Sequence, residues 1–563
     1  MYPQRHLLGE VIRDLGFINQ FQLEEALQEQ KNSGKRLGEV LLEKGYLTEE
    51  ALLSCLEQHL GISRIGLSQI NLNGDQLELI PLSIIQRHQV VPVKIKDNQL
   101  ILAMVDPLNV LAIEDVRMAS GYEVIPVLIS PREIKLIINR LVSLRARVDL
   151  EKAAQSLKED TESYLAANQS ELRTQEPAIE PLVVKIVNGV INQGVVSRAS
   201  DIHIEPQEKE LRIRYRIDGV LHEAMSLPLK SHGSIVSRVK IMANLDIAER
   251  RLPQDGRIHL SGETNPLDLR ISTLPTVFGE KVMLRILDRR ETVPTIDKLD
   301  LRGSNLINFK DIISRSAGLI LVCGPTGSGK TTTLYSLLTF LNSVTRNMIT
   351  LEDPVECIIP GINQVQINSR SCFGFASGLR SVLRQDPDVI MVGEIRDRET
   401  AELAVRAAIT GHLVLSTIHT RRAAGAVTRL IDMGIEPYLL MSSLVGVIAQ
   451  RLVRRVCLEC GTPIPVTVES ARQLGINPEN AQLRQGQGCS WCGDTGYWGR
   501  MAIHEVMVIT PEIQELIRQQ VPEGILEKTA VAQGMITLRQ DGLDKALLGE
   551  TAIEEVLNAV DQY

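Results

Sequence analysis

The sequence lacks any apolar run close to the roughly 18 residues that a membrane-spanning helix requires. The apolar stretch Ala317–Cys323 has the length of a buried strand instead. The first residues, Met1–His6, contain no apolar core of the kind that signal peptides carry. Together these absences predict a cytoplasmic protein.

An excess of positive charge is also missing. The chain has 61 Lys and Arg against 69 Asp and Glu, which gives a formal net charge of −8. Such a balance provides no general attraction to nucleic acid or anionic lipid, and the sequence contains no long basic run. We therefore expect no nucleic-acid partner. Any membrane association is expected to be peripheral and to depend on partner proteins or a local patch.

The composition is otherwise that of a soluble globular protein, with 44% hydrophobic and 23% charged residues. At 563 residues the chain is too long for one hydrophobic core and suggests roughly three or four domains. Changes in composition and periodicity predict these segments: an N-terminal helical repeat (1–62), an α/β module (63–144), a linker (145–178), a second α/β domain (179–292), a P-loop core (293–455), a cysteine-rich insert (456–500) and a helical C-terminal region (501–563).

The N-terminal repeat is visible as a motif that occurs twice. Leu8–Val11 recurs 29 residues later as Leu37–Val40, and Gly16 and Gly45 occupy equivalent positions. Each copy predicts a short helix, a glycine turn and a second helix with leucines on one face.

Strand-like runs alternate with helical stretches in the second half of the chain. The expected strands are Leu319–Cys323, Met348–Leu351, Val389–Val392 and Leu413–Thr417. This alternation indicates a mostly parallel, doubly wound α/β sheet. Beyond residue 500 the pattern predicts helix only.

A phosphate-binding loop follows the first of these strands. Its glycines allow backbone N–H groups to surround phosphates, Lys330 reaches the β- and γ-phosphates, and the Thr331 hydroxyl is suited to bind magnesium. The strand before the loop and the helix-prone stretch after it argue against an accidental glycine-rich turn. The predicted nucleotide-binding residues are Gly324, Pro325, Thr326, Gly327, Ser328, Gly329, Lys330, Thr331 and Thr332.

Phosphoryl transfer also needs a carboxylate that positions water or metal. Glu394 ends the apolar strand at Val389–Val392, where ligands of doubly wound sheets bind. Glu352 belongs to a second acidic cluster, after the strand at Met348–Leu351. The alternatives are an ordinary strand-end glutamate and a polar loop, and the P-loop upstream favours the catalytic interpretation.

The eight cysteines comprise four single residues and two C-x-x-C pairs, Cys457/Cys460 and Cys489/Cys492. In a cytoplasmic chain two such pairs predict a four-thiolate zinc site, with disulfides or a redox pair as the alternative. Four protein ligands leave no open position for water, so the predicted role is structural.

These motifs resemble those of the ATPases of type IV pilus assembly and type II secretion. The matching stretches in the core are Thr331–Tyr335, Ile349–Glu356, Leu379–Asp397 and Thr410–Thr420, with Gly393 where generic P-loop enzymes carry aspartate. Further matches are Ser200–Pro206, Arg214–Gly219, Leu252–Arg257, Pro275–Lys281 and Gln450–Arg455. One departure is the pair Arg421–Arg422 after His419, where the family commonly has asparagine.

The resemblance implies a RecA-like core preceded by a PAS-like α/β domain. It also implies a homohexamer that hydrolyses ATP at an inner-membrane platform protein, together with pilus accessory proteins. Glu352 and Glu394 would orient water or hold magnesium, and His419 would sense the γ-phosphate. The PAS-like domain would meet a neighbouring subunit's nucleotide. Its candidate cations are Arg214, Arg216, Arg257 and Arg270, with structural ion pairs as the alternative.

The doubled N-terminal motif resembles tandem motifs that bind cyclic di-GMP in some of these ATPases. Arg36 supplies the expected arginine in the second copy. Leu7 replaces arginine in the first copy, and His59 replaces the glutamine that Gln30 supplies there. The alternative is a helical domain that docks on a membrane partner.

The repeat, the α/β module and the linker favour pilus assembly, and similar tetracysteine inserts occur in assembly motors and not in retraction motors. A type II secretion ATPase shares nearly every motif. Two less favoured functions are those of a RecA-like nucleic-acid translocase, which the acidic balance disfavours, and of a scaffold that binds nucleotide without hydrolysis.

Overall fold

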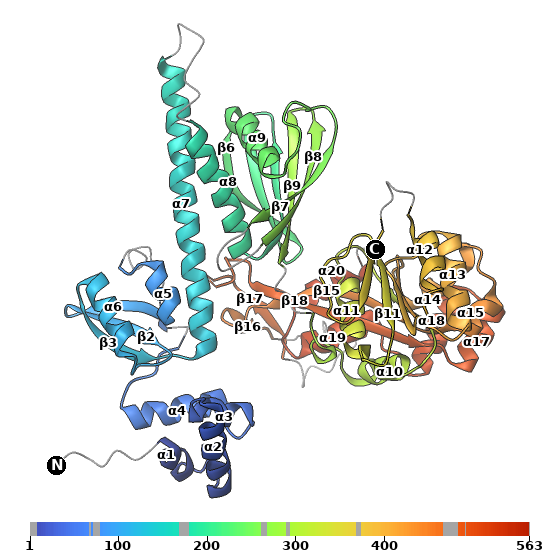
Figure 1. Cartoon of the computed structure of the whole chain (residues 1–563), viewed down its shortest axis with the longest axis horizontal. Helices are drawn as coiled ribbons and strands as arrows, with labels where there is room; N and C mark the ends of the chain where they lie inside the picture. The colour runs from blue at the N-terminus through green and yellow to red at the C-terminus, as the bar shows by residue number, and fades with distance from the viewer. Residues whose placement is uncertain are drawn as a thin grey trace. The chain divides into compact units, whose positions relative to one another are not determined.

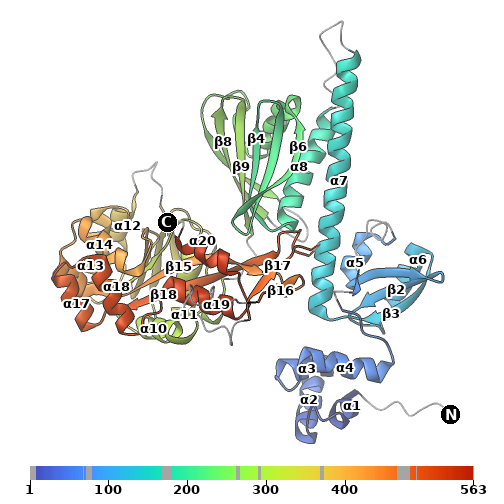
Figure 2. The ribbon, with the colours of Figure 1, turned by 180° about the vertical axis from the view of Figure 1, so that it is seen from behind.

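The structure is a computed structural model that describes residues 8–66, 69–70, 79–167, 179–260, 267–288, 293–367, 373–465, 482–489 and 491–561. Leu7 of the first repeat and the single Cys372 lie outside these ranges. The chain divides into two compact units, one of residues 1–217, 221–256 and 271–285 and one of residues 218–220, 257–270 and 286–563. Figures 1 and 2 show the chain from opposite sides. Within the described parts, no helix is both long and apolar enough to cross a bilayer.

The N-terminal repeat folds as two helix pairs, as predicted. These are α1 (Leu8–Asp14), α2 (Gln20–Ser33), α3 (Leu37–Glu43) and α4 (Glu49–Leu60). Gly16 and Gly45 form the turns with φ of 77° and 69°, a conformation that favours glycine. Ile12, Leu23 and Leu41 are buried in one small core that both copies share.

A small α/β module follows the repeat. It comprises α5 (Leu82–His88), β1 (Val90–Lys96), β2 (Gln99–Met104), α6 (Val110–Ser120), β3 (Glu123–Leu128) and α7 (Pro131–Ala167). Strands β1 and β2 are antiparallel, and β2 and β3 are parallel. Helix α7 extends through much of the segment 145–178, which we expected to be a linker that is helical in part, because residues such as Glu, Gln and Ala favour helix even without an apolar pattern.

A six-stranded sheet in the order β6-β5-β4-β9-β8-β7 forms the second α/β domain. Its elements are α8 (Ile179–Val196), β4 (Ala199–Pro206), β5 (Glu210–Ile217), β6 (Val220–Pro228), a 3₁₀ turn (Leu229–Ser231), α9 (His232–Met242), β7 (Gln254–Leu260), β8 (Leu267–Thr276) and β9 (Gly279–Asp288). Figures 1 and 2 show α8 and α9 on one face. There Val190 and Val239 pack with Ile204 and Leu284 of the sheet.

A seven-stranded sheet in the order β12-β11-β13-β14-β10-β15-β18 forms the centre of the second unit. Only β18 is antiparallel to its neighbour, so the prediction of a mostly parallel, doubly wound α/β core is confirmed. The strands are β10 (Gly318–Cys323), β11 (Met348–Glu352), β12 (Asn363–Gln366), β13 (Val389–Val392), β14 (Leu413–Ile418), β15 (Leu444–Val456) and β18 (Tyr497–Val508).

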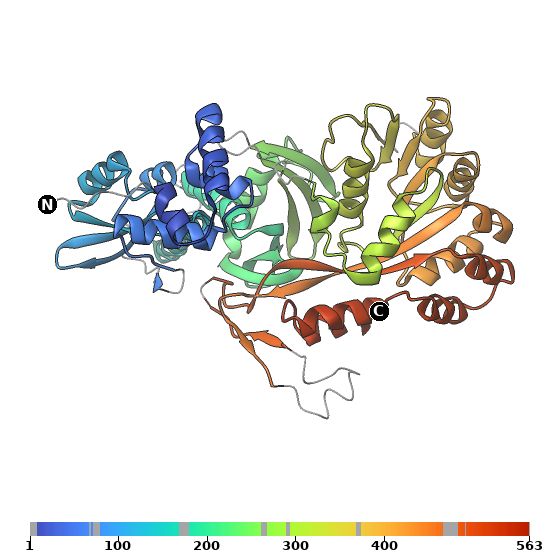
Figure 3. The same ribbon diagram turned by 90° about the horizontal axis from the view of Figure 1, so that it is seen from below.

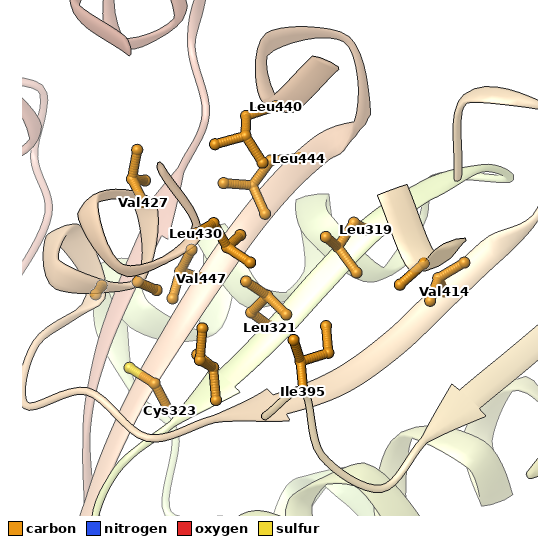
Figure 4. Packing of buried hydrophobic residues seen from close by; sticks show 14 of the residues in the cluster. Leu319, Leu321, Cys323, Ile395, Val414, Val427, Leu430, Leu440, Leu444 and Val447 are labelled. Atoms are coloured by element: carbon orange, nitrogen blue, oxygen red, sulfur yellow. The ribbon is translucent and has the colours of Figure 1, made fainter. Parts of the chain in front are cut away.

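Helices cover both faces of this sheet. They are a 3₁₀ turn (Ile296–Lys298), α10 (Gly303–Ile313), α11 (Lys330–Leu341), α12 (Phe375–Val382), α13 (Arg398–Ile409), α14 (Ala423–Asp432), α15 (Pro437–Ser443), α17 (Pro511–Arg518), α18 (Glu523–Ala532), α19 (Leu538–Leu547) and α20 (Ile553–Asp561). Along β10, Leu321 belongs to one buried cluster, whereas Val322 belongs to another on the opposite face. Figure 4 shows Leu321, Leu430 and Val447 pointing toward one another in the first cluster.

The prediction of helix alone after residue 500 was wrong for residues 501–508. Strand β18 continues through Val508 and pairs with β15, and the two form the long orange and red ribbons that lie side by side in Figure 3. Residues Met501–Met507 are buried on both faces, so the run lacks the polar alternation by which a half-exposed strand is identified. A short hairpin of β16 (Gly461–Pro463) and β17 (Arg484–Gly486) lies between β15 and β18 in the chain.

Candidate functional site

The phosphate-binding loop connects the carboxyl end of β10 to the first turn of α11. Gly324, Gly327 and Gly329 have φ of 153°, 80° and 85°, which suit glycine. A Cβ atom on Gly324 would lie 2.6 Å from the backbone carbonyl oxygen of Gln450, and one on Gly329 would lie 2.7 Å from Nε2 of the Gln450 side chain. Backbone conformation therefore favours glycine at all three positions, and close packing adds to it at Gly324 and Gly329.

Lys330 is a buried cation at the start of α11. Its Nζ donates to the carbonyl oxygens of Gly324 (2.9 Å) and Pro325 (2.8 Å). Burial lowers the pKa of Lys330, because the charged ammonium is poorly solvated there. These hydrogen bonds hold the positive charge of Lys330 against the loop. A positive charge in that position fits a site for an anion such as phosphate. Thr331 and Thr332 are exposed in the same helical turn.

Glu352 is buried at the end of β11, with 3% of its surface exposed. Its carboxylate accepts hydrogen bonds from Thr350 Oγ1 (2.6 Å), Gln364 Nε2 (3.1 Å) and the hydroxyl of Tyr335 on α11. Burial raises the pKa of Tyr335, and the hydrogen bond to Glu352 raises it further. Tyr335 therefore joins the helix of the phosphate loop to the acidic strand end.

Glu394 directly follows β13, and its backbone is fixed between two neighbouring strands. The N–H of Gly393 donates to the Leu351 carbonyl (2.8 Å), and the N–H of Ile395 donates to the Thr417 carbonyl (2.9 Å). The Glu394 side chain is 15% exposed and lies 2.6 Å from Nη2 of Arg396. The carboxylate is thus held at the sheet edge while one side remains accessible.

The two histidines of the stretch Thr410–Thr420 lie at opposite ends of β14. His419 follows its carboxyl end, is half exposed, and places Nε2 3.5 Å from Oε2 of Glu394. His412 precedes its amino end, where Nδ1 lies 2.9 Å from the Ala407 carbonyl. Only His419 is at the edge that carries the phosphate loop.

Four strand ends thus meet at one edge of the sheet. In register, β14 pairs with both β10 and β13, and β13 pairs with β11. The structure therefore brings the phosphate loop, Glu352, Glu394 and His419 to the carboxyl edge where doubly wound sheets bind ligands. The arrangement combines an anion cradle, two carboxylates and a histidine, groups that suit phosphoryl transfer to water.

The four candidate arginines lie on the six-stranded sheet. Arg214 donates from Nε and Nη2 to the two carboxylate oxygens of Glu205, each at 2.9 Å. Arg216 lies 3.7 Å from a carboxylate oxygen of Asp201. Arg257 is exposed on β7, and Arg270 is partly buried on β8.

The four paired cysteines form one cluster in which all Sγ atoms lie within 4.8 Å of one another. Three of the separations are 3.9 Å (Cys457 to Cys489), 3.8 Å (Cys460 to Cys492) and 3.7 Å (Cys489 to Cys492). A tetrahedral zinc with Zn–S bonds of about 2.3 Å places its sulfur atoms about 3.8 Å apart. These cysteines are free, and their geometry fits zinc and not a disulfide.

Sequence reasoning missed two residues that contact the phosphate site. Tyr335 and Gln450 both lie inside the stretches that carry the family resemblance. This resemblance is the one signal in the sequence that indicated these two residues. Gln450 on β15 is 2% exposed, and its Nε2 donates to the carbonyl of Ser328 (2.9 Å) in the loop.

Comparison with known proteins gives two family matches. Residues 176–558 match the family described as "Type II/IV secretion system protein". Residues 60–148 match the MshEN domain, which begins where the helical repeat ends.

Relatives from both branches align over nearly the whole chain. Over 555 residues the chain is 43% identical to the type IV pilus assembly ATPase PilB of Myxococcus xanthus, and the alignment covers 98% of each protein. It is 41% identical over 555 residues to the type II secretion system protein E of Xanthomonas campestris, covering 95% of each. The type II secretion system ATPase E of Vibrio cholerae is 49% identical over 381 residues, which are 68% of this chain and 76% of that protein.

Proposed function

Because the chain belongs to the type II/IV secretion system protein family, we propose that it is a hexameric motor whose ATP hydrolysis powers assembly of a type IV pilus. The chain is a P-loop ATPase. We place it in the cytoplasm, peripherally at the inner membrane, where an integral platform protein and pilus accessory proteins are its partners. The observation that carries the proposal is the end-to-end match to a pilus assembly ATPase, which includes the N-terminal repeat and the long helix α7.

A second candidate is a type II secretion ATPase that drives assembly of a pseudopilus. The 41% identity to a type II secretion protein over nearly the same length favours it. Both functions require the same chemistry, so the distinction lies in the partners and not in the ATP site.

At the site, the loop Gly324–Thr331 is proposed to hold the phosphates of ATP, with Lys330 at the β- and γ-phosphates and the Thr331 hydroxyl on magnesium. Glu352 and Glu394 orient the attacking water or hold magnesium, with Glu352 as a candidate base. His419 senses the γ-phosphate through its proximity to Glu394.

The experiment that tests the cellular role is Lys330→Ala in the native host, with surface pili and exported proteins scored in the same strain. Lys310→Ala is a matched control, because Lys310 is an exposed lysine on α10 of the same core. Loss of pili with normal export supports pilus assembly. Normal pili with exported proteins retained in the cell would establish the second candidate instead.

In the proposed ring, each nucleotide site lies at the interface of two neighbouring subunits. We propose that the arginines Arg214, Arg216, Arg257 and Arg270 supply cations across that interface. Mixing two variants tests whether subunits share a site. In a ring of Arg257→Ala and Lys330→Ala subunits, some sites combine an intact phosphate loop from one copy with an intact Arg257 from the next. Recovery of ATP turnover on mixing two inactive variants supports a shared site. A mixture that remains inactive would contradict a shared site.

Two further ligands are proposed. Zinc is bound by Cys457, Cys460, Cys489 and Cys492, and cyclic di-GMP is bound by the N-terminal repeat through Arg36 at the start of α3. Titration of the full chain with cyclic di-GMP tests the second proposal, with Arg36→Ala expected to weaken binding and Arg13→Ala, on α1, as the control. Absence of binding by the native chain would leave the repeat as a docking domain for a membrane partner.

A further inference from the structure

The loop that follows β14 (residues 419–423, the histidine loop) is fixed by backbone hydrogen bonds at its base, residues 421–423. The carbonyl oxygen of Arg421 accepts a hydrogen bond from Arg451 (2.8 Å), and that of Arg422 accepts one from the thiol of Cys323 (3.5 Å). The N–H of Ala423 donates to the buried carboxylate of Glu505 (2.8 Å). Side chains of three strands, β15, β10 and β18, therefore hold the backbone of residues 421–423. The side chain of His419, a few residues earlier, is half exposed.

The side chain of Arg422 adds a fourth anchor to this base. Its Nη1 lies 2.7 and 2.6 Å from the two carboxylate oxygens of Glu527 on α18. The pKa of Arg422 is raised by this hydrogen-bonded pairing. The base of the histidine loop is thus fixed by side chains from several elements.

The phosphate loop is held by Gln450, which lies on β15 beside Arg451. Its Nε2 donates to the Ser328 carbonyl (2.9 Å), and its Oε1 accepts from the Thr333 hydroxyl (2.6 Å). One buried amide therefore binds both the loop and the first turn of α11. Because both amide atoms are used, the orientation of Gln450 is determined by its partners.

Arg451 connects the two loops. Its Nη1 donates to the carbonyl oxygen of Gln450 (3.0 Å) and its Nη2 to that of Arg421 (2.8 Å), and the residue is only 6% exposed. A guanidinium carries its donors on separate nitrogen atoms of one rigid plane, so it can span two acceptors that a single ammonium nitrogen does not reach together. The nearby charge of Arg451 also adds to burial in lowering the pKa of Lys330.

We propose that Gln450 and Arg451 are positioning residues that couple the phosphate loop to the histidine loop, so that Lys330 and His419 adopt their catalytic positions together. The inference deepens the proposed ATPase mechanism and is independent of whether a pilus or a pseudopilus is built. It predicts that a change at Arg451 affects turnover through His419, not through folding or nucleotide affinity.

The test is Arg451→Lys in the full chain, which keeps the charge and removes the two separate donor nitrogens that reach Gln450 and Arg421. Arg454→Lys is the matched control, because Arg454 lies on the same strand and forms a two-point pair with Glu555 (2.9 and 2.6 Å) away from the loops. We expect Arg451→Lys to lower kcat more than tenfold, with ATP affinity changed less than threefold and a Tm close to that of Arg454→Lys. A kcat within twofold of the native value would overturn the proposal.

A double-mutant cycle with His419→Ala separates coupling from a general packing defect. Coupled loops predict that adding His419→Ala to Arg451→Lys lowers kcat by less than threefold further. Independent effects, in which the two losses multiply, would contradict the coupling.

Gln450→Glu repeats the test from the phosphate loop, because it keeps the acceptor for Thr333 and removes the donor to Ser328. We expect it to give the same non-additive result with His419→Ala. Failure of the proposed function itself would differ, since Lys330→Ala would then leave both pili and secretion normal.

Discussion

The Nε2 atom of His419 lies 3.5 Å from Oε2 of Glu394, so the ends of β13 and β14 present a histidine and a carboxylate to the same point. The two residues are 25 positions apart in the chain and meet because β13 and β14 are adjacent parallel strands. A group that enters beside Glu394 must therefore contact or displace His419. In the proposed mechanism, this relationship is how His419 senses the γ-phosphate.

His419→Ala is expected to reduce the preference for ATP over ADP and to lower kcat by about 10- to 100-fold, since it removes a group that positions the reacting centre. Fluorescent-nucleotide competition and steady-state turnover measure the two effects. His412→Ala is the matched control, because that side chain bonds to the Ala407 carbonyl at the other end of β14. Equal loss in both variants would show that the effect is structural.

Tyr335→Phe is expected to lower kcat severalfold and to destabilise the protein by about 1–3 kcal/mol. The substitution removes the hydroxyl that donates to Glu352 and accepts from the Glu356 N–H (3.1 Å), and it leaves the ring in place. Thermal unfolding and turnover check the two parts. A variant with native turnover would mean that Glu352 does not depend on Tyr335 for its position.

Cys460→Ser is expected to lose zinc and to lower the Tm, because a structural site with three thiolates binds zinc less tightly and the β16–β17 hairpin loses its cross-link. Metal analysis should give about one zinc per native chain. Cys357→Ser, a single cysteine outside the cluster, should keep its metal. Equal zinc content in the two variants would remove the proposed site.

Acid should weaken the six-stranded sheet through Glu205. Burial acts to raise the pKa of this carboxyl, but hydrogen bonds from Arg214 and Lys281 outweigh burial and lower the pKa to about 2 from 4.5. This shift corresponds to about 3 kcal/mol of stability, which is present above pH 4.5 and is lost as the pH falls toward 2.

Glu205→Gln should therefore lower the Tm at pH 7, and the difference from the native protein should shrink as the pH falls from about 5 to about 3. Glu208→Gln, an exposed neighbour, should show no such trend. A Tm difference that does not change with pH would contradict the ion-pair account.

What could be predicted from the sequence was encoded locally. The phosphate loop needs glycine at fixed spacing, so Gly324–Thr331 could be identified without tertiary information. The same holds for the cysteine pairs and for the repeat, in which Gly16 and Gly45 mark equivalent turns. Buried parallel strands such as β10 were recognised because their apolar runs are short and bounded by turn residues.

What could not be predicted depends on contacts between distant segments. Gln450 is 122 residues from Ser328, and no local pattern indicates that its amide holds the loop. The use of Arg214 in a pair with Glu205 likewise follows from the pairing of β4 with β5. Strand β18 was missed because burial on both faces removes the alternation that distinguishes a strand from a helix.

The most direct test of the account is the binding and hydrolysis of ATP by Glu394→Gln, an isosteric substitution that removes one of the two carboxylates proposed to orient the attacking water. We expect ATP to bind with nearly native affinity while kcat falls at least 100-fold, because the phosphate loop is unchanged and the water is no longer activated. Turnover at the native rate would contradict the account, since the end of β13 could not then be the position at which hydrolysis is catalysed.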